Sequence, residues 1–119
     1  MKASGDVVLL RFPFSDQAQG KLRPAMLLAK VPGPHDDWLI CMITSQIRHA
    51  IPQFDEWIEP EDADFLESGL KVPSTIRIAR LAVAQKDVAV GRLGRVSQAR
   101  HQSMRGHLSE WLGGLLPSS

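Results

Sequence analysis

The sequence of 119 residues has a single cysteine, Cys41, and no long apolar run. One cysteine cannot form an internal disulfide, and Cys41 lies in the apolar run WLICMIT, where we expect it to be a small buried hydrophobic residue. No apolar run approaches the ~20 residues that a membrane-spanning helix needs. Asp6 interrupts any apolar region of a signal peptide. These absences favour a protein of the reducing cytoplasm that does not cross a membrane.

The common catalytic signatures are also missing. The four histidines are scattered, without the HExxH or CxxC spacing that holds a metal ion. There is no GxSxG motif, no Cys/His nucleophile arrangement and no GxxxxGK[ST] phosphate loop. The stretch GRLGR is too short to cradle phosphates, and we expect it to be a turn before a helix. Any reaction would therefore run without a metal, a cofactor or a covalent nucleophile, through charge stabilisation and proton transfer.

The chain has little net charge, +1, so its bulk electrostatics does not indicate a nucleic-acid binder. The charges are unevenly distributed, however. There are seven acids and no base between Asp55 and Glu67, and eight bases against two acids from Lys71 onward. A split of this kind can create a basic face on a nearly neutral molecule. The alternative is a set of ordinary solvated positions.

Apolar residues make up 44% of the sequence, which is enough to form the core of one folded domain that spans residues 1–119. Short strands are predicted over 6–14, 24–30, 38–44, 53–59 and 75–83. Residues 87–96 could be a further short strand that ends in glycine turns. A short helical turn is expected over 60–66. Ser97 can cap a final helix, whose apolar stripe is Met104, Leu108, Trp111, Leu112 and Leu115. Many short strands with one closing helix predict a mainly β protein, a small and strongly bent β-barrel.

Arg23 stands directly before Pro24, where a basic turn meets an apolar run. A charge there cannot help the core, so it binds an anion or ends a strand in solvent. Four segments occur in the order GDVVLLRFPFSD, GKLRPAMLLA, ICMITSQI and SGLKVPSTIRI. Together they resemble the MazF/PemK family of toxins from bacterial toxin–antitoxin pairs, over roughly residues 5–112. The most specific pieces are GDVV, the Arg-Pro dipeptide and ITSQ.

The resemblance implies an SH3-like β-barrel with a C-terminal helix, usually a homodimer. It also implies a toxin that cuts single-stranded RNA at short sequences without a metal or cofactor. In that chemistry the ribose 2′-hydroxyl attacks the adjacent phosphate, which leaves a 2′,3′-cyclic phosphate and a 5′-hydroxyl. The implied protein partner is a cognate antitoxin, whose tail would fold along the barrel.

By resemblance, Arg23 and Thr44 match the catalytic arginine and threonine of the family. A guanidinium offers a planar fork of donors that suits two oxygens of a phosphorane. Thr44 could donate to the same phosphate or orient the attacking hydroxyl. The residues expected to contact the RNA substrate are Lys21, Ser45, Gln46 and Arg77; for Lys21, simple solubility is the alternative.

The sequence departs from the family in the loop before Arg23, where many members carry Glu-Gln. Here the nearest carboxylate is Asp16, which leaves the identity of a general base open. His49 follows ITSQ closely and could reach RNA. One alternative function is a non-catalytic SH3-like binding module, or an inactive relative with a regulatory role, which has no need of Arg23 and Thr44 in one cleft. A DNA-directed regulator is disfavoured because no helix-turn-helix pattern is present.

Overall fold

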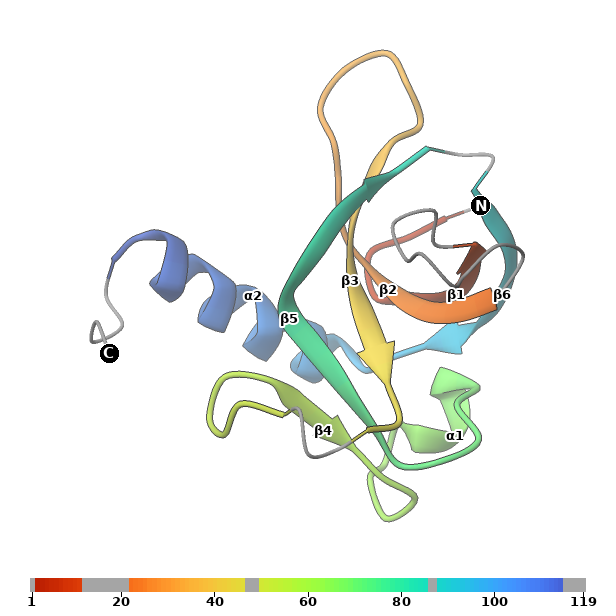
Figure 1. Cartoon of the computed structure of the whole chain (residues 1–119), viewed down its shortest axis with the longest axis vertical. Coiled ribbons are helices and arrows are strands. Elements are labelled where there is room, and N and C mark those ends of the chain that lie inside the picture. The colour runs from red at the N-terminus through yellow and green to blue at the C-terminus, as the bar shows by residue number, and fades with distance from the viewer. Residues whose placement is uncertain (1, 12–21, 47–49, 86–87, 115–119) are drawn as a thin grey trace.

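The computed structural model describes residues 2–11, 22–46, 50–85 and 88–114. In these residues one antiparallel sheet has the strand order β4-β5-β3-β2-β1-β6 (Figure 1). The strands are β1 (Asp6–Arg11), β2 (Leu22–Lys30), β3 (Trp38–Thr44), β4 (Glu56–Ile58), β5 (Ser74–Ala84) and β6 (Ala89–Arg95). The helices are α1 (Phe65–Ser68) and α2 (Gln98–Leu112). The prediction of a mainly β protein with a C-terminal helix is confirmed.

The sheet is strongly curved (Figure 1). Cys41 pairs with Leu81, but the next residue, Met42, pairs with Arg77, so residues 78–80 of β5 bulge out of the ladder. A bulge bends its strand and increases the local twist. Asp55 holds this bulge, because its Oδ1 accepts a hydrogen bond of 3.0 Å from the backbone N–H of Ile78. Within the described residues the ladders do not close, and β4 and β6 remain the two edges of a curled sheet.

Apolar side chains cover both faces of the central strands. The cluster that reaches α2 includes Met26, Cys41, Ile76, Met104 and Leu108. The second cluster includes Val8, Leu10, Leu27, Trp38 and Ile40. Successive residues of a strand point to opposite faces, so a strand that is covered on both sides reads as one apolar run. The prediction that residues 38–44 form such a strand is confirmed, and burial raises the pKa of the Cys41 thiol.

Helix α2 begins as expected, since the Ser97 side chain accepts a hydrogen bond of 3.1 Å from the backbone N–H of Arg100. Its predicted apolar stripe is buried only in part of its described length, and Leu115, the last member, lies outside the described residues. Met104 and Leu108 enter the core, whereas Trp111 and Leu112 are 42% and 68% exposed. The reason is that the C-terminal part of α2 projects beyond the sheet (Figure 1).

The segment GRLGR lies within β6, so the prediction of a turn there is wrong. A Cβ on Gly94 would collide with the backbone of Glu67 and Ser68 in α1. A Cβ on Gly69 would likewise collide with the backbone of Leu93. The φ of Gly69, 77°, also lies in the left-handed region that favours glycine. Glycine inside a strand often marks such a close approach of another backbone. These two glycines let α1 pack directly on β6.

We expect Gly94→Ala to lower the free energy of unfolding by about 2–3 kcal/mol, because the group in its way is backbone and cannot swing aside. Urea denaturation measures this difference. Gly106→Ala is the matched control, since an added Cβ there meets nothing within 4 Å. In the middle of α2 it should raise the free energy by about 0.5–1 kcal/mol. A Gly94→Ala protein as stable as the wild type would contradict this packing of α1 on β6.

Candidate active site

A groove of about 400 Å³ opens where the start of β2, the end of β3 and β6 meet the segment that follows α1. These elements come together at the lower right of Figure 1. The polar residues of its lining are Arg23, Thr44, Ser45, Gln46, Lys71 and Ser74, and the apolar ones include Leu9, Ile43, Leu70 and Leu93. Apolar walls with a few convergent polar groups are typical of ligand sites. Four residues predicted from the sequence are therefore brought together here.

The ladder between β2 and β3 explains why Arg23 and Thr44 meet. Ala25 of β2 pairs with Met42 of β3. Arg23 lies two residues before Ala25 in β2, and Thr44 lies two residues after Met42 in β3, so both lie at the same end of this antiparallel pair. Residues two apart on a strand point to the same face, so Arg23 shares the face of Ala25 and Thr44 shares that of Met42. An arginine and a hydroxyl from segments about twenty residues apart thus face one groove.

Arg23 is exposed, and it has no ion-pair or hydrogen-bond partner among the residues that the structure describes. Pro24 favours extended geometry for the residue before it, which carries the arginine side chain outward from the start of the strand. The planar fork of donors on its guanidinium is therefore available to an anion in the groove.

Thr44 is half-buried at the last position of β3. Its Oγ1 accepts a hydrogen bond of 3.1 Å from the backbone N–H of Gln46. This bond closes a tight turn that fixes Ser45 and Gln46 at the rim of the groove. The hydroxyl proton of Thr44 remains able to be donated, because the observed bond uses only an acceptor position of the oxygen.

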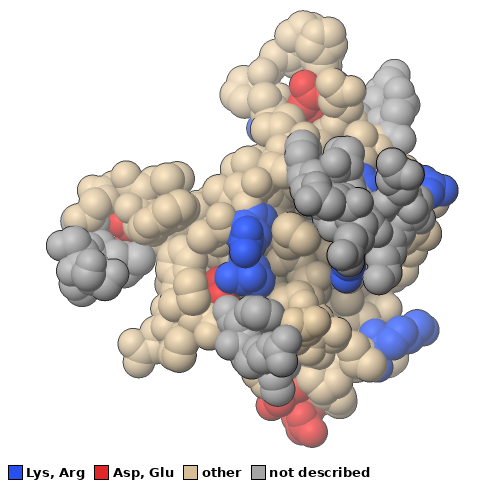
Figure 2. All heavy atoms as spheres, viewed as in Figure 1, with Lys and Arg blue, Asp and Glu red and all other residues tan. Residues whose placement is uncertain are grey.

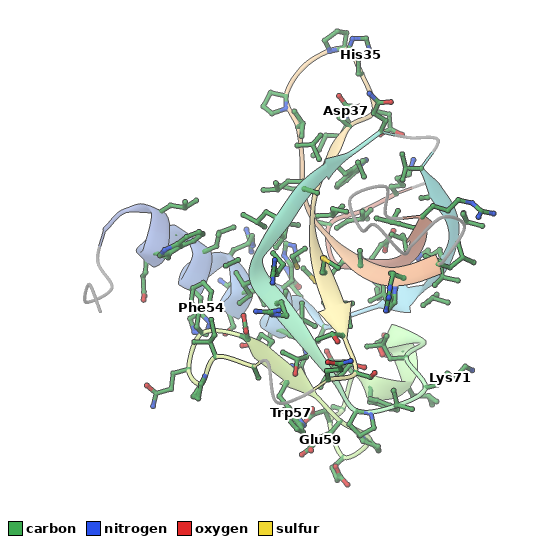
Figure 3. The ribbon with its side chains drawn as sticks, in the orientation of Figure 1. His35, Asp37, Phe54, Trp57, Glu59 and Lys71 are labelled. Atoms are coloured by element: carbon green, nitrogen blue, oxygen red, sulfur yellow. The ribbon has the colours of Figure 1, made fainter. Side chains whose placement is uncertain are left out.

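Lys71 and Ser74 also line the groove, and sequence reasoning did not single them out. Figure 3 shows that Lys71 extends outward from the segment between α1 and β5. The available signal was the segment SGLKVPSTIRI, which carries both residues. Nothing in a single sequence distinguishes Lys71 from the other bases of the C-terminal half. Lys71 adds a second positive charge to the groove that contains Arg23.

Arg77 does not line the groove. Arg77 pairs with Met42, which lies two residues before Thr44 in β3. The side chains of Arg77 and Thr44 therefore point to the same face of the sheet. Its Nε is buried and has no hydrogen-bond partner in the described structure, and the same is true of the hydroxyl of Thr75, which pairs with Thr44. Contact between Arg77 and RNA stays a prediction.

Three of the sequence candidates, Asp16, Lys21 and His49, lie outside the described residues. In residues 2–11, 22–46, 50–85 and 88–114, no group of three or more His, Cys, Asp or Glu side chains is arranged to hold a metal ion. No helix in this part of the chain has the length and apolar content to cross a membrane.

The acidic stretch of the sequence serves a structural role. Arg100 of α2, whose side chain is 12% exposed, donates to Asp64 through Nε and Nη2 at 2.8 and 3.0 Å. It also donates to Glu56 at 3.1 Å, to Asp62 at 3.3 Å and to the carbonyl of Trp57 at 2.9 Å. These bonds tie the start of α2 to β4 and to the segment before α1. Three of the seven acids of this stretch are thus bound to Arg100 within the fold.

Asp64 is the centre of this network. Burial alone would raise the pKa of its carboxyl, but hydrogen bonds from Arg100 and from the backbone N–H of Ser97 outweigh burial and lower that pKa. Figure 2 shows basic side chains at the surface over the middle of β5 and on the side of β6, and acidic ones at the bottom, at the top and beside the basic ones over β5. Both signs of charge therefore show on this face.

Comparison with protein families gives a match over residues 3–112 to the PemK-like, MazF-like toxins of type II toxin–antitoxin systems. The chain belongs to this family. Among solved structures, this PemK-like toxin is similar to an endoribonuclease in complex with its cognate antitoxin from Mycobacterial species. The TM-score is 0.66 at 18% identity, over 100% of both chains, which supports the fold. No curated protein gives a significant sequence match.

Membership of the PemK-like toxins confirms the family indicated by GDVV, Arg-Pro and ITSQ. In this toxin the three motifs lie in neighbouring strands. Asp6 and Val7 begin β1, Arg23 and Pro24 begin β2, and Thr44 ends β3. Because β1 and β2 are antiparallel, Val7 lies beside Met26 in the middle of β2, and Leu10 near the end of β1 lies beside Arg23. The Arg-Pro and ITSQ motifs therefore lie at the same end of the sheet, whereas GDVV begins toward the other end.

Proposed function

We propose that this PemK-like toxin is an endoribonuclease that cuts single-stranded RNA in the groove containing Arg23 and Thr44. The observation that carries the proposal is that a guanidinium without a partner among the described residues and a hydroxyl from a second strand line the same groove. Lys71 adds positive charge, and the apolar walls offer a surface for a nucleobase. Among the predicted contacts, Ser45 and Gln46 stand at the rim. Lys21 and Arg77 are the other two residues that we propose to contact the RNA.

The reaction fits these groups. The 2′-oxygen forms a bond to the neighbouring phosphorus and loses its proton, while the bond from phosphorus to the 5′-oxygen breaks and that oxygen gains a proton. The products are a 2′,3′-cyclic phosphate and a 5′-hydroxyl. Negative charge grows on the phosphoryl oxygens in between, and a donor held ready for that charge lowers the barrier. We assign this role to Arg23, and to Thr44 the donation of a hydrogen bond to the same phosphate.

We further propose that a cognate antitoxin neutralises the toxin and that the toxin acts as a homodimer. Support for the first comes from the family, whose members are the toxins of toxin–antitoxin pairs. Support for the second comes from Trp111 and Leu112, which leave an apolar surface at the end of α2. An antitoxin that covers the groove would exclude RNA, which gives inhibition a direct physical basis.

The experiment is incubation of the purified protein with single-stranded RNA in EDTA, followed by analysis of the fragment ends. We expect cleavage to continue under chelation and to give 5′-hydroxyl ends and cyclic phosphates. A 2′-deoxy sugar at the cut site should block it, because the nucleophile is missing. RNA that is bound but stays intact at high protein concentration would instead favour a binding module.

Thr44→Val tests the hydroxyl. We expect kcat to fall about 10- to 100-fold, which corresponds to the ~1.5–3 kcal/mol of a hydrogen bond to a charged group. Thr44→Ser should keep most of the activity. Thr75→Val is the matched control, since Thr75 stands opposite Thr44 but its hydroxyl is buried and has no partner in the described structure. If Thr44→Val and Thr75→Val cut RNA equally well, the assignment to Thr44 is wrong.

A further inference from the structure

A second hollow, of about 680 Å³, lies at the start of α2. The end of β2, the end of β6 and the first turns of α2 surround it. Its charged lining residues are Lys30, Arg95, Arg105 and Glu67. Three cations therefore face one anion, in a hollow that is separate from the groove of Arg23.

Two of these cations are not engaged by the part of the fold that the structure describes. Arg95 and Arg105 are exposed and have no ion-pair or hydrogen-bond partner among the described residues. Lys30 donates to the carbonyl of His35 at 2.8 Å. The contrast with Arg100, whose guanidinium is fully engaged, is informative because Arg100 lies on the same helix as Arg105. Two guanidinium forks thus remain for a ligand with several anionic oxygens.

The floor of the hollow is neutral. His101 is buried there, and its Nε2 lies 2.9 Å from the carbonyl oxygen of Leu28. Burial, aided by the positive charge of Arg105, lowers the pKa of His101. The positive charge of the hollow therefore comes from its rim, where Lys30, Arg95 and Arg105 stand.

The hollow lies beside the active-site groove, on the other side of the α1–β6 contact. Leu93 of β6 lines the groove, and Arg95, two residues later on the same strand, lines the hollow. On α1 and just after it, Glu67 lines the hollow and Gly69 lines the groove. The backbones of α1 and β6 touch between the two sites. A ligand must therefore be a chain long enough to pass over this contact in order to occupy both.

We propose that this hollow binds the phosphate backbone of RNA that flanks the cut site, through Arg95 and Arg105 with Lys30. The inference rests on the proposed nuclease function and extends it beyond the scissile phosphate. Proteins bind single strands with positively charged grooves that track the backbone. An acidic peptide offers the same sign of charge, but the place of the hollow beside the groove favours the polymer that is cut there.

The test compares two RNA probes with a 2′-deoxy sugar at the cut site, a short one of about 4 nucleotides and a long one of about 16. Binding is measured at several salt concentrations for the wild type and for Arg95→Ala/Arg105→Ala. For the long probe, the slope of log Kobs against log salt should shrink by about 0.7 for each arginine. Binding of the short probe should not change. The control is Arg80→Ala, an exposed arginine of β5 that lines neither hollow.

An unchanged slope for the long probe, or an equal loss in Arg80→Ala, overturns the proposal while cleavage in the groove stands. A poly-glutamate peptide that binds the wild type but not the double variant, with RNA binding unaffected, also overturns it and assigns the hollow to an acidic peptide. If the wild type binds the long probe but cuts no RNA, a weakened double variant supports the hollow although the nuclease function fails. If it binds neither probe, both proposals fall.

Discussion

Arg23→Ala is expected to reduce kcat for RNA cleavage by about 100- to 1,000-fold, the usual effect of removing one prepositioned donor to a developing oxyanion. The guanidinium lines the groove, is exposed and has no partner in the described structure. Its removal should therefore leave the fold intact and the phosphorane without its main counter-charge. Single-turnover cleavage in EDTA, at protein concentrations well above KM, measures the chemical step.

Two further variants sharpen this result. Arg23→Lys keeps the positive charge but replaces a planar fork with a point charge, so we expect it to recover only part of the rate. Arg80→Ala removes an arginine outside the groove and should cut RNA as the wild type does. A rate in Arg23→Ala within a few-fold of the wild type, with the same products, would remove Arg23 from the mechanism. If Arg80→Ala lost as much activity as Arg23→Ala, the role of Arg23 would be no more than a contribution to the overall positive charge.

Much of this fold was accessible from sequence, because short-range signals specify most of it. Short-range sequence patterns placed all six strands, and Ser97 marked the start of α2. The motifs predicted that Arg23 and Thr44 lie in one site, and the pairing of β2 with β3 explains why they do. A single sequence could not show which residues outside the motifs line the groove, and Lys71 was therefore not predicted.

The errors share one physical cause, which is contact between segments distant in sequence. Gly94 looked like a turn residue, but its role is to let the backbone of α1 approach β6. The apolar stripe of α2 suited either the core or a subunit contact, and only the structure shows that Met104 and Leu108 are buried whereas Trp111 and Leu112 are exposed. Arg100 looked like one more base of a basic half, although its partners lie 36 to 44 residues earlier in the chain. Local patterns carry no information about such partners.

Arg100→Ala is expected to lower the free energy of unfolding by about 3–5 kcal/mol, the usual cost of breaking a buried ion pair by removing one partner. Three carboxylates, of Glu56, Asp62 and Asp64, would remain together without their cation. The start of α2 would also lose its ties to β4. Urea denaturation at neutral pH measures the effect. Arg105→Ala, on the same helix but without a described partner, should change stability by less than about 0.5 kcal/mol.

The pH dependence separates this network from simple loss of packing. The pKa of Asp64 is lowered in the folded protein from its ordinary 3.8, so its contribution is complete above that value and is lost as the pH falls through the lowered one. In Arg100→Ala, protonation instead relieves repulsion among the remaining carboxylates. The stability difference between wild type and variant should therefore shrink below about pH 4. A difference that stays constant from pH 7 to pH 3 would show that Arg100 acts through its alkyl chain, because apolar packing does not titrate.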